Sequence, residues 1–133
     1  MSPAHLVALL ALAFPASAHL LRLDVVAALA RAADAHHVPA PVLAAVCWCE
    51  SRVGTAPRYA SLCGTRIHHV YVRSDALSAD LAALSLRRRR AECGSWPRAL
   101  VAYRWGRGCL AADPTGYARR VLRVAQRLGH VEP

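Results

Sequence analysis

The chain has 133 residues, of which 56% are hydrophobic and 19% are charged. This length allows one domain and leaves little room for a second, and the composition excludes an acidic disordered tail or a low-complexity linker. The net charge is +9 and all 17 basic residues are arginine, which favours a polyanionic partner: nucleic acid, an anionic membrane surface or a cell-wall polymer.

The first 18 residues have the pattern of a secretory signal peptide. An uncharged apolar run covers Leu6–Phe14, and the segment Pro15–Ala18 ends in the small residues of a cleavage site. The run is too short to span a bilayer as a stable anchor, and no other stretch is long and apolar enough to cross a membrane. We therefore expect cleavage after Ala18 and export of a mature domain, His19 to Pro133, to the periplasm or the extracellular space. The alternative is that this run begins an ordinary buried helix.

The mature part is predicted to be mostly α-helical. Helical periodicity and end signals indicate helices at Leu20–Ala35, Pro41–Arg52, Asp75–Glu92, Trp96–Trp105 and Gly116–Leu128. Ser74 and Ser95 are expected to cap the third and fourth of these helices at their N-termini. Gly54–Arg73 shows no lasting period and is expected to be a loop, in which only Ile67–Val72 has the composition of a strand. The fold class is therefore a small α domain with a long central loop.

Five cysteines lie in the mature part, and in a small exported domain they indicate disulfides. They are Cys47, Cys49, Cys63, Cys93 and Cys109. Two bridges and one free thiol is the simplest count; five choices of free cysteine times three pairings of the rest leave 15 arrangements. Cys47 and Cys49 lie two apart on a predicted helix, so they point in different directions and are not expected to bridge each other.

A metal site is the alternative for these cysteines. It would use Cys47, Cys49 and Cys63 together with the pair His68-His69. No Cys-x-x-Cys spacing is present, and an oxidising compartment works against free thiolates. We therefore predict no metal and no cofactor.

Glu50 stands out among the eight acidic residues. It follows the nearly unbroken apolar run Val42–Cys49 near the end of the most buried predicted helix. Burial disfavours a charged carboxylate and raises its pKa, which suits a general acid that works near neutral pH. The alternative is a carboxylate that emerges into solvent at the helix end or pairs with Arg52.

The order and spacing of several short segments carry a resemblance to a known family. These segments are Glu50-Ser51, Gly64-Thr65-Arg66-Ile67, Ala102-Tyr103-Arg104-Trp105-Gly106 with the later Gly108, and Tyr117-Ala118-Arg119-Arg120-Val121. Over about Val38 to Leu128 the chain resembles the catalytic domain of the soluble lytic transglycosylases, relatives of lysozyme that cleave peptidoglycan. That family has a buried helix ending in Glu-Ser, then Gly-Leu-Met-Gln, then Ala-Tyr-Asn-Ala-Gly, and a final helix with a Tyr near its start.

The resemblance implies a function for the matched residues. Glu50 would be the catalytic residue, first as acid and then as base, cleaving the β-1,4 bond between N-acetylmuramic acid and N-acetylglucosamine with 1,6-anhydro ends. Substrate-binding roles would fall to Ser51, Gly64, Tyr103 and Trp105. A lysozyme-type hydrolase would usually need a second carboxylate across the sugar, for which Asp75 and Asp113 are the candidates.

The chain also departs from the family pattern. Only Gly64 remains of Gly-Leu-Met-Gln, and Arg104 stands where the family has Asn. If Arg66 and Arg104 lie near Glu50, they favour its charged form and oppose a raised pKa. A non-catalytic peptidoglycan-binding module on the same fold is therefore an alternative function.

The run Arg87–Arg90 suggests nucleic acid, but weakly. Four consecutive helical positions turn through most of the circumference, so they do not form one flat face, and no nucleic-acid motif accompanies them. We expect peptidoglycan glycan strands as the partner, no nucleic acid, and a monomer.

Overall fold

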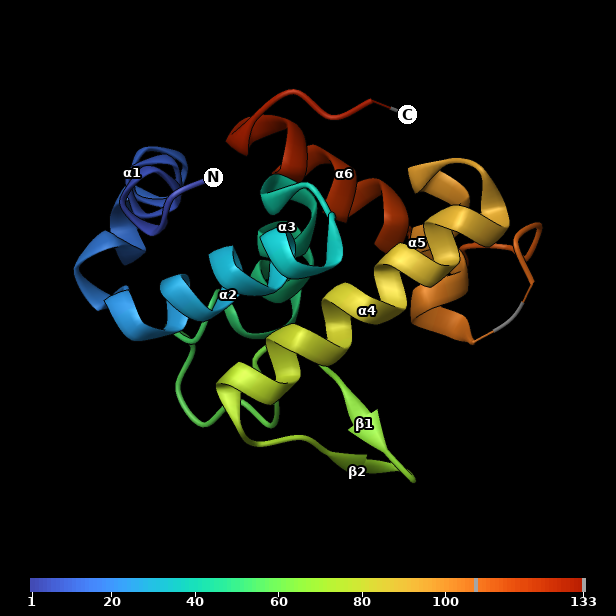
Figure 1. Cartoon of the computed structure of the whole chain (residues 1–133), viewed down its shortest axis with the longest axis horizontal. Helices are drawn as coiled ribbons and strands as arrows, with labels where there is room; N and C mark the ends of the chain where they lie inside the picture. The colour runs from blue at the N-terminus through green and yellow to red at the C-terminus, as the bar shows by residue number, and fades with distance from the viewer. Residues whose placement is uncertain (107, 133) are drawn as a thin grey trace.

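The structure is a computed structural model that describes residues 1–106 and 108–132 (Figure 1). Its helices are α1 (Pro3–Ala13), the 3-10 helix η1 (Pro15–Leu20), α2 (Leu23–His36), α3 (Ala40–Ser51), α4 (Asp75–Cys93), α5 (Trp96–Trp105) and α6 (Tyr117–Leu128). Its strands are β1 (Arg66–Ile67) and β2 (Val70–Tyr71), paired antiparallel. The predicted α fold class is confirmed.

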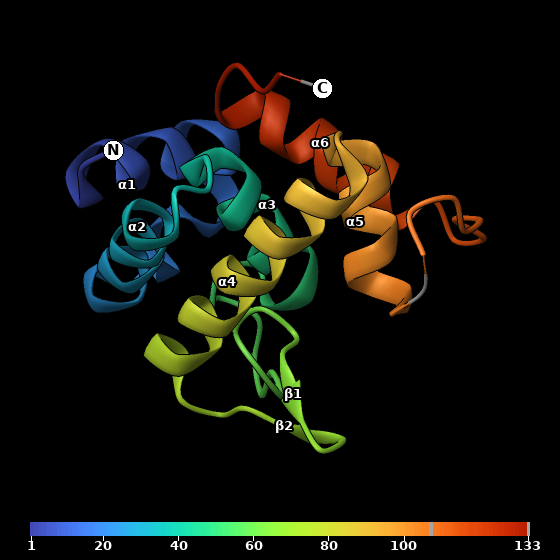
Figure 2. The ribbon, with the colours of Figure 1, turned by 45° about the vertical axis from the view of Figure 1, so that its right-hand side comes forward.

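Helix α3 lies at the centre of the fold and contacts α2, α4 and α6 (Figures 1 and 2). Every residue of 40–47 is buried, because neighbouring helices cover the apolar run from all sides. The helix ends at Ser51, after which Arg52 and Val53 adopt left-handed backbone angles and reverse the chain. This arrangement puts Glu50, in the last turn of α3, at the boundary between the core and the surface.

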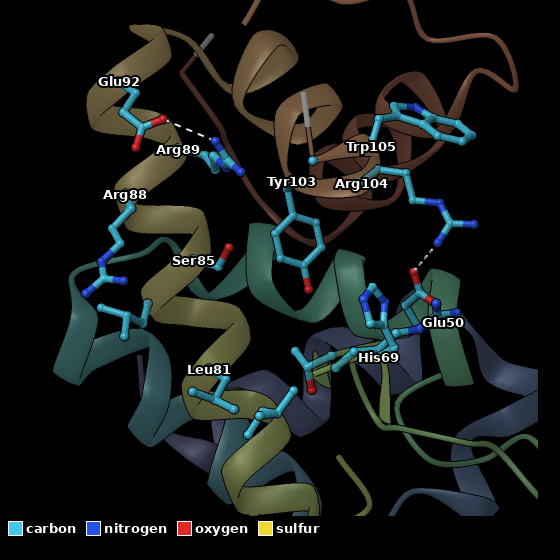
Figure 3. Close-up of a pocket in the computed structure, with 16 residues that line it drawn as sticks. Glu50, His69, Leu81, Ser85, Arg88, Arg89, Glu92, Tyr103, Arg104 and Trp105 are labelled. Carbon is cyan, nitrogen blue, oxygen red and sulfur yellow. Dashed lines mark hydrogen bonds and ion pairs between the residues drawn. The ribbon is translucent and has the colours of Figure 1, made fainter. Parts of the chain in front are cut away.

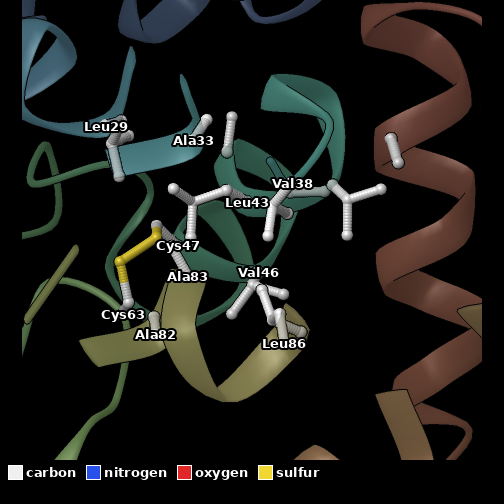
Figure 4. Packing of buried hydrophobic residues seen from close by; sticks show 14 of the residues in the cluster. Leu29, Ala33, Val38, Leu43, Val46, Cys47, Cys63, Ala82, Ala83 and Leu86 are labelled. Atoms are coloured by element: carbon white, nitrogen blue, oxygen red, sulfur yellow. A yellow bond between two sulfur atoms is a disulfide. The ribbon is translucent and has the colours of Figure 1, made fainter. Parts of the chain in front are cut away.

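Small and branched side chains make up the part of the core where α2, α3 and α4 meet (Figure 4). Fully or nearly fully buried members include Leu29, Ala33, Leu43, Val46, Ala82, Ala83 and Leu86. The alanines of α2 and α4 carry little bulk, so these two helices can approach each other closely, and they share an extensive contact.

Two disulfides brace the helices. Cys47 bonds to Cys63 and Cys93 bonds to Cys109, and Cys49 is free. The expected count of two bridges and one free thiol is confirmed, and so is the expectation that neighbouring Cys47 and Cys49 do not bridge each other. Because Cys47 and Cys63 are bonded to each other, neither thiol is available to the alternative metal site. Among residues 1–106 and 108–132, no three His, Cys, Asp or Glu side chains converge to hold a metal ion.

Apart from the start of α2, each predicted helix end lies within one residue of the observed one. Helix α2 begins at Leu23 and not at Leu20, because Leu20 is the last residue of the 3-10 helix η1. Ser74 caps α4 as expected, its hydroxyl accepting from the backbone of Leu77 at 3.2 Å. Ser95 occupies the predicted N-cap position of α5 with extended backbone, but its side chain makes no capping bond.

The segment predicted as a single strand, Ile67–Val72, forms most of a two-stranded hairpin instead. Ile67 pairs with Val70, and the intervening His68 and His69 have φ values of 50° and 67°. Two consecutive residues with positive φ make the tight turn that reverses a hairpin. The hairpin projects from the helices and is largely exposed (Figure 2).

The N-terminal segment packs on the helical domain. Leu6 and Leu10 of α1 are fully buried where this helix contacts α2 and α6, and the Phe14 ring stacks on Trp48 with centroids 3.6 Å apart. The alternative interpretation, in which the apolar run is a buried helix, requires contacts of this kind. Cleavage after Ala18 stays a prediction. Throughout residues 1–106 and 108–132, each helix is too short or too polar to cross a bilayer.

Candidate active site

A cleft of about 980 Å³ lies between α4, α5 and the β hairpin, with the end of α3 as its floor (Figure 3). This volume is at the upper end of the range found for ligand pockets, about 300–1,000 Å³. Four of the five predicted site residues line it: Glu50, Gly64, Tyr103 and Trp105. Tertiary structure thus brings together residues from three segments far apart in the sequence.

Glu50 and Gly64 are in direct contact. Gly64 has a φ of +69°, and a Cβ atom placed on it would lie 2.5 Å from both Cδ and Oε2 of Glu50. A non-bonded carbon pair prefers about 3.5–4.0 Å, so a side chain at position 64 would displace the Glu50 carboxyl group. The glycine is therefore required both by its left-handed backbone and by the carboxyl group packed against it.

The Glu50 carboxyl group experiences two opposing influences. Its side chain is 21% exposed, and burial raises its pKa, while the positive charges of Arg104, Arg66 and Arg120 act to lower it. Burial is the stronger influence, so the pKa lies above its ordinary value. The predicted raised pKa and its opposition by Arg66 and Arg104 are both confirmed. The ion-pair partner is Arg104, whose Nη1 lies 3.9 Å from Oε1, and not Arg52.

Two tyrosines lie beside Glu50. The Tyr103 hydroxyl donates to the carbonyl oxygen of Cys63 at 3.0 Å, which fixes α5 against the residue before Gly64. The Tyr117 hydroxyl is buried and has no hydrogen-bond partner among the residues that the structure describes. Burial raises the pKa of both hydroxyls, and the negative charge of Glu50 raises them further.

Tyr117 received no predicted role, although it belongs to the last matched segment. The feature of the sequence that could have located Tyr117 is the turn Asp113–Gly116, which precedes α6. The Asp113 carboxylate accepts from the backbone N–H groups of Tyr117 and Ala118, each at 3.0 Å, and so caps the helix. This cap orients the first turn of α6, which carries the Tyr117 ring toward Glu50.

Ser51, the fifth predicted site residue, does not line the cleft. Its side chain is buried, and its hydroxyl donates to the carbonyl of Leu62 at 2.7 Å and accepts from the N–H of Gly54 at 3.0 Å. These bonds tie the end of α3 to the chain two residues before Gly64. Ser51 therefore positions the contact between Glu50 and Gly64, and its predicted role in binding substrate has no direct contact to support it.

The candidate second carboxylates are used elsewhere. Asp113 caps α6 and also accepts from Nε1 of Trp105 at 3.3 Å. Asp75 accepts from the Tyr59 hydroxyl at 3.0 Å at the start of α4 and does not line the cleft. The carboxylate that does line it, besides Glu50, is Glu92, which sequence reasoning did not select. Glu92 lies at the opposite end of the cleft and pairs with Arg89 at 3.3 Å (Figure 3).

The cleft is strongly basic. Its lining includes Arg66, His69, Arg88, Arg89 and Arg104 against the two carboxylates of Glu50 and Glu92. The run Arg87–Arg90 is dispersed around α4 as predicted: its second and third members line the cleft, and Arg90 lies 5.8 Å from the centre of the Trp96 ring. Periodicity alone did not show which of these arginines would face the cleft, because α4 has apolar residues on more than one side.

Comparison of the chain with protein-family models, with curated proteins and with solved structures found no match. The resemblance to the soluble lytic transglycosylases therefore stays an expectation from the matched segments of the sequence.

Proposed function

We propose that this protein is a lytic transglycosylase that cleaves the β-1,4 bond between N-acetylmuramic acid and N-acetylglucosamine in peptidoglycan. Glu50 is the catalytic residue, and Gly64, Tyr103 and Trp105 line the sugar-binding cleft around it. The observation that carries the proposal is the Glu50 carboxyl group: it sits against Gly64, opens into a cleft of about 980 Å³ and has a raised pKa.

The chemistry requires one group that first donates a proton and then accepts one. Protonated Glu50 gives its proton to the glycosidic oxygen as the bond from that oxygen to C1 of the muramoyl ring breaks. The resulting carboxylate then removes the proton from the C6 hydroxyl of the same ring, whose oxygen bonds to C1. This sequence leaves a 1,6-anhydro end, consumes no water and restores the protonated acid, so a single carboxylate suffices.

Two other functions each have an observation in their favour. The guanidinium of Arg104, 3.9 Å from Glu50, favours the charged carboxylate and so favours a module that binds the glycan without cleaving it. The presence of Glu92 in the same cleft favours a hydrolase with two carboxylates, although the two side chains lie at opposite ends (Figure 3).

The test is to incubate the oxidised protein with purified peptidoglycan and to identify the soluble fragments by mass spectrometry. We expect anhydro-muropeptides, and we expect Glu50→Gln to lower their rate of release by about 10²- to 10⁴-fold, the usual contribution of a general acid or base. Glu132→Gln is the matched control, because it makes the same chemical change at an exposed position near the C-terminus.

Each alternative gives a different result. Fragments with reducing ends identify a hydrolase, and Glu92→Gln then tests the second carboxylate. If no fragments appear but the protein co-sediments with the wall, the binding module is correct. A Glu50→Gln variant that cleaves as fast as the Glu132→Gln control shows that Glu50 is not the acid.

The proposal includes export to the periplasm or beyond. Two disulfides suit an oxidising compartment, and the apolar run with its small-residue site supports a cleaved leader. N-terminal sequencing of the protein recovered from its native compartment tests this. A chain that begins at His19 supports cleavage, and one that retains Leu6 and Leu10 supports a structural α1.

A further inference from the structure

Two arginines from different elements converge on the Glu50 end of the cleft. Arg66 lies in β1, where its guanidinium bonds to the Tyr71 hydroxyl and lies 4.2 Å from the centre of that ring. Arg104 lies at the end of α5, with its guanidinium 5.4 Å from the centres of the Trp105 and Tyr117 rings. Aromatic contacts hold the faces of such groups and leave their N–H edges free to bind an anion.

The positive charge at this end is poorly compensated. Arg104 is 45% exposed, and its contact with Glu50, at 3.9 Å, is too long for a hydrogen bond. Glu92, the other carboxylate in the cleft, is paired with Arg89 (Figure 3). Among the described residues that line this end of the cleft, Glu50 is the one carboxylate beside these two guanidinium groups, so a neutral sugar chain would leave their charge half compensated. A carboxylate on the substrate matches the planar donor edge of arginine.

We propose that Arg104 and Arg66 bind a carboxylate of the substrate next to the scissile bond, and that the cleft therefore selects carboxylate-bearing glycans over neutral ones. This inference rests on the proposed function and specifies its substrate. When such a glycan binds, the Arg104 guanidinium exchanges the Glu50 carboxylate for that of the substrate. Arg104 and Arg66 are thus specificity-determining residues at positions where the resembled family has other side chains.

This exchange has a consequence for the acid. The charged and titratable groups around Glu50 come from several elements. Arg104, Arg66 and Arg120 lower its pKa, whereas Tyr103, Tyr117 and Cys49, whose own pKa values are raised, are neutral near pH 7. His69 of the hairpin turn lines the same cleft beside Glu50 (Figure 3). Of the three arginines, Arg104 lowers the pKa of Glu50 most. When a substrate anion neutralises the charge of Arg104, this effect is lost and the protonated form of Glu50 is favoured. A neutral glycan leaves that effect in place, so it is cleaved slowly even when it is bound.

The test compares three glycans of similar length. Peptide-free chains of alternating N-acetylglucosamine and N-acetylmuramic acid carry lactyl carboxylates, strands with intact stems carry peptide carboxylates, and chitin oligosaccharides are neutral. We expect Arg104→Gln and Arg66→Gln each to lower cleavage of the carboxylate-bearing substrate on the order of 10- to 100-fold, as expected for loss of a hydrogen bond between charged groups. We expect both variants to increase cleavage of chitin oligosaccharides, because each removes a positive charge that opposes the protonated form of Glu50.

Arg98→Gln is the matched control, because Arg98 lies on the same helix α5, is exposed and does not line the cleft. The pH profile supplies a second readout: the alkaline limb for chitin cleavage, along which the rate falls as Glu50 loses its proton, should move to higher pH in Arg104→Gln and not in Arg98→Gln. Preference for peptide-free chains identifies the lactyl group as the source of the carboxylate, and preference for intact strands identifies the stem. Equal losses on charged and neutral glycans overturn the inference while the proposed function stands.

The binding affinity for each glycan, measured without cleavage, distinguishes failure of the proposed function from failure of this inference. Each glycan is titrated into the Glu50→Gln variant, with and without Arg104→Gln, by calorimetry. If the wild type cleaves nothing but charged glycans bind more tightly than chitin in an Arg104-dependent manner, the carboxylate site exists in a binding module. If binding shows no such preference, the inference is wrong whatever the activity.

Discussion

Gly64→Ala tests whether the contact between Gly64 and Glu50 organises the site. The new Cβ would lie 2.5 Å from Glu50 Cδ, and restoring a contact of about 3.5 Å requires a shift of about 1 Å in the carboxyl group. A misplacement of about 1 Å in a reacting group can lower the rate by about 10²-fold. Alanine in the left-handed region also costs about 1–2 kcal/mol of folding free energy.

Gly94→Ala is the matched control for this prediction. Gly94 has a φ of 78°, and a Cβ atom there meets nothing within 4 Å. Alanine at this position therefore carries the free-energy cost of a left-handed backbone but displaces no neighbouring group. Urea unfolding followed by circular dichroism should show that the control loses about 1–2 kcal/mol. The Gly64 variant should lose at least as much, and it alone should lose about 10²-fold in the release of anhydro-muropeptides.

A readout that does not depend on activity is the titration of Glu50 by ¹³C NMR. Because burial is the main cause of its raised pKa, pushing the carboxyl group toward solvent should move its pKa back toward the ordinary value. If the pKa of Glu50 and the cleavage rate change equally in the Gly64 and Gly94 variants, the contact does not organise the site and the reasoning fails.

Three further predictions concern stability. The raised pKa of Glu50 means that its charged form destabilises the fold. Glu50→Gln should therefore become more stable than wild type as the pH rises from the pKa of Glu50 in the unfolded chain through its raised pKa in the folded protein, and should show no such gain at lower pH. Urea unfolding at a series of pH values measures this difference. Replacing Cys47 and Cys63 together by alanine should cost about 3 kcal/mol in chemical unfolding, the loop-closure value for a separation of 16 residues, whereas Cys49→Ser should cost much less. Tyr117→Phe removes a buried hydroxyl without a partner in the described part of the chain and should raise the melting temperature, since such a group costs about 1–3 kcal/mol; a lower value contradicts the assignment.

The sequence by itself determined the helical class and most helix positions. Apolar periodicity, the Ser74 cap and the glycines and prolines that end segments are local signals, and local backbone preferences settle them. The apolar run of α3 also predicted that Glu50 would be partly buried with a raised pKa, because a carboxyl group at the end of such a run is desolvated by whatever covers the helix. Local signals were weaker for the hairpin, where the turn depends on positive φ at His68 and His69, residues that are not strong turn formers.

Tertiary structure decided how the residues of the site fit together. The pairing of Cys47 with Cys63, the fit of Gly64 against Glu50 and the inward direction of Ser51 depend on contacts between residues many positions apart. The roles of Asp113 as a helix cap and of Glu92 as a member of the cleft could not be read from composition, since an acidic residue near a helix end fits either role. Periodicity reports which side of a helix is apolar, but it does not report which other helix lies opposite. The matched segments suggested that Arg66 and Arg104 would lie near Glu50, but the additional influence of Arg120 emerged only when the chain was folded.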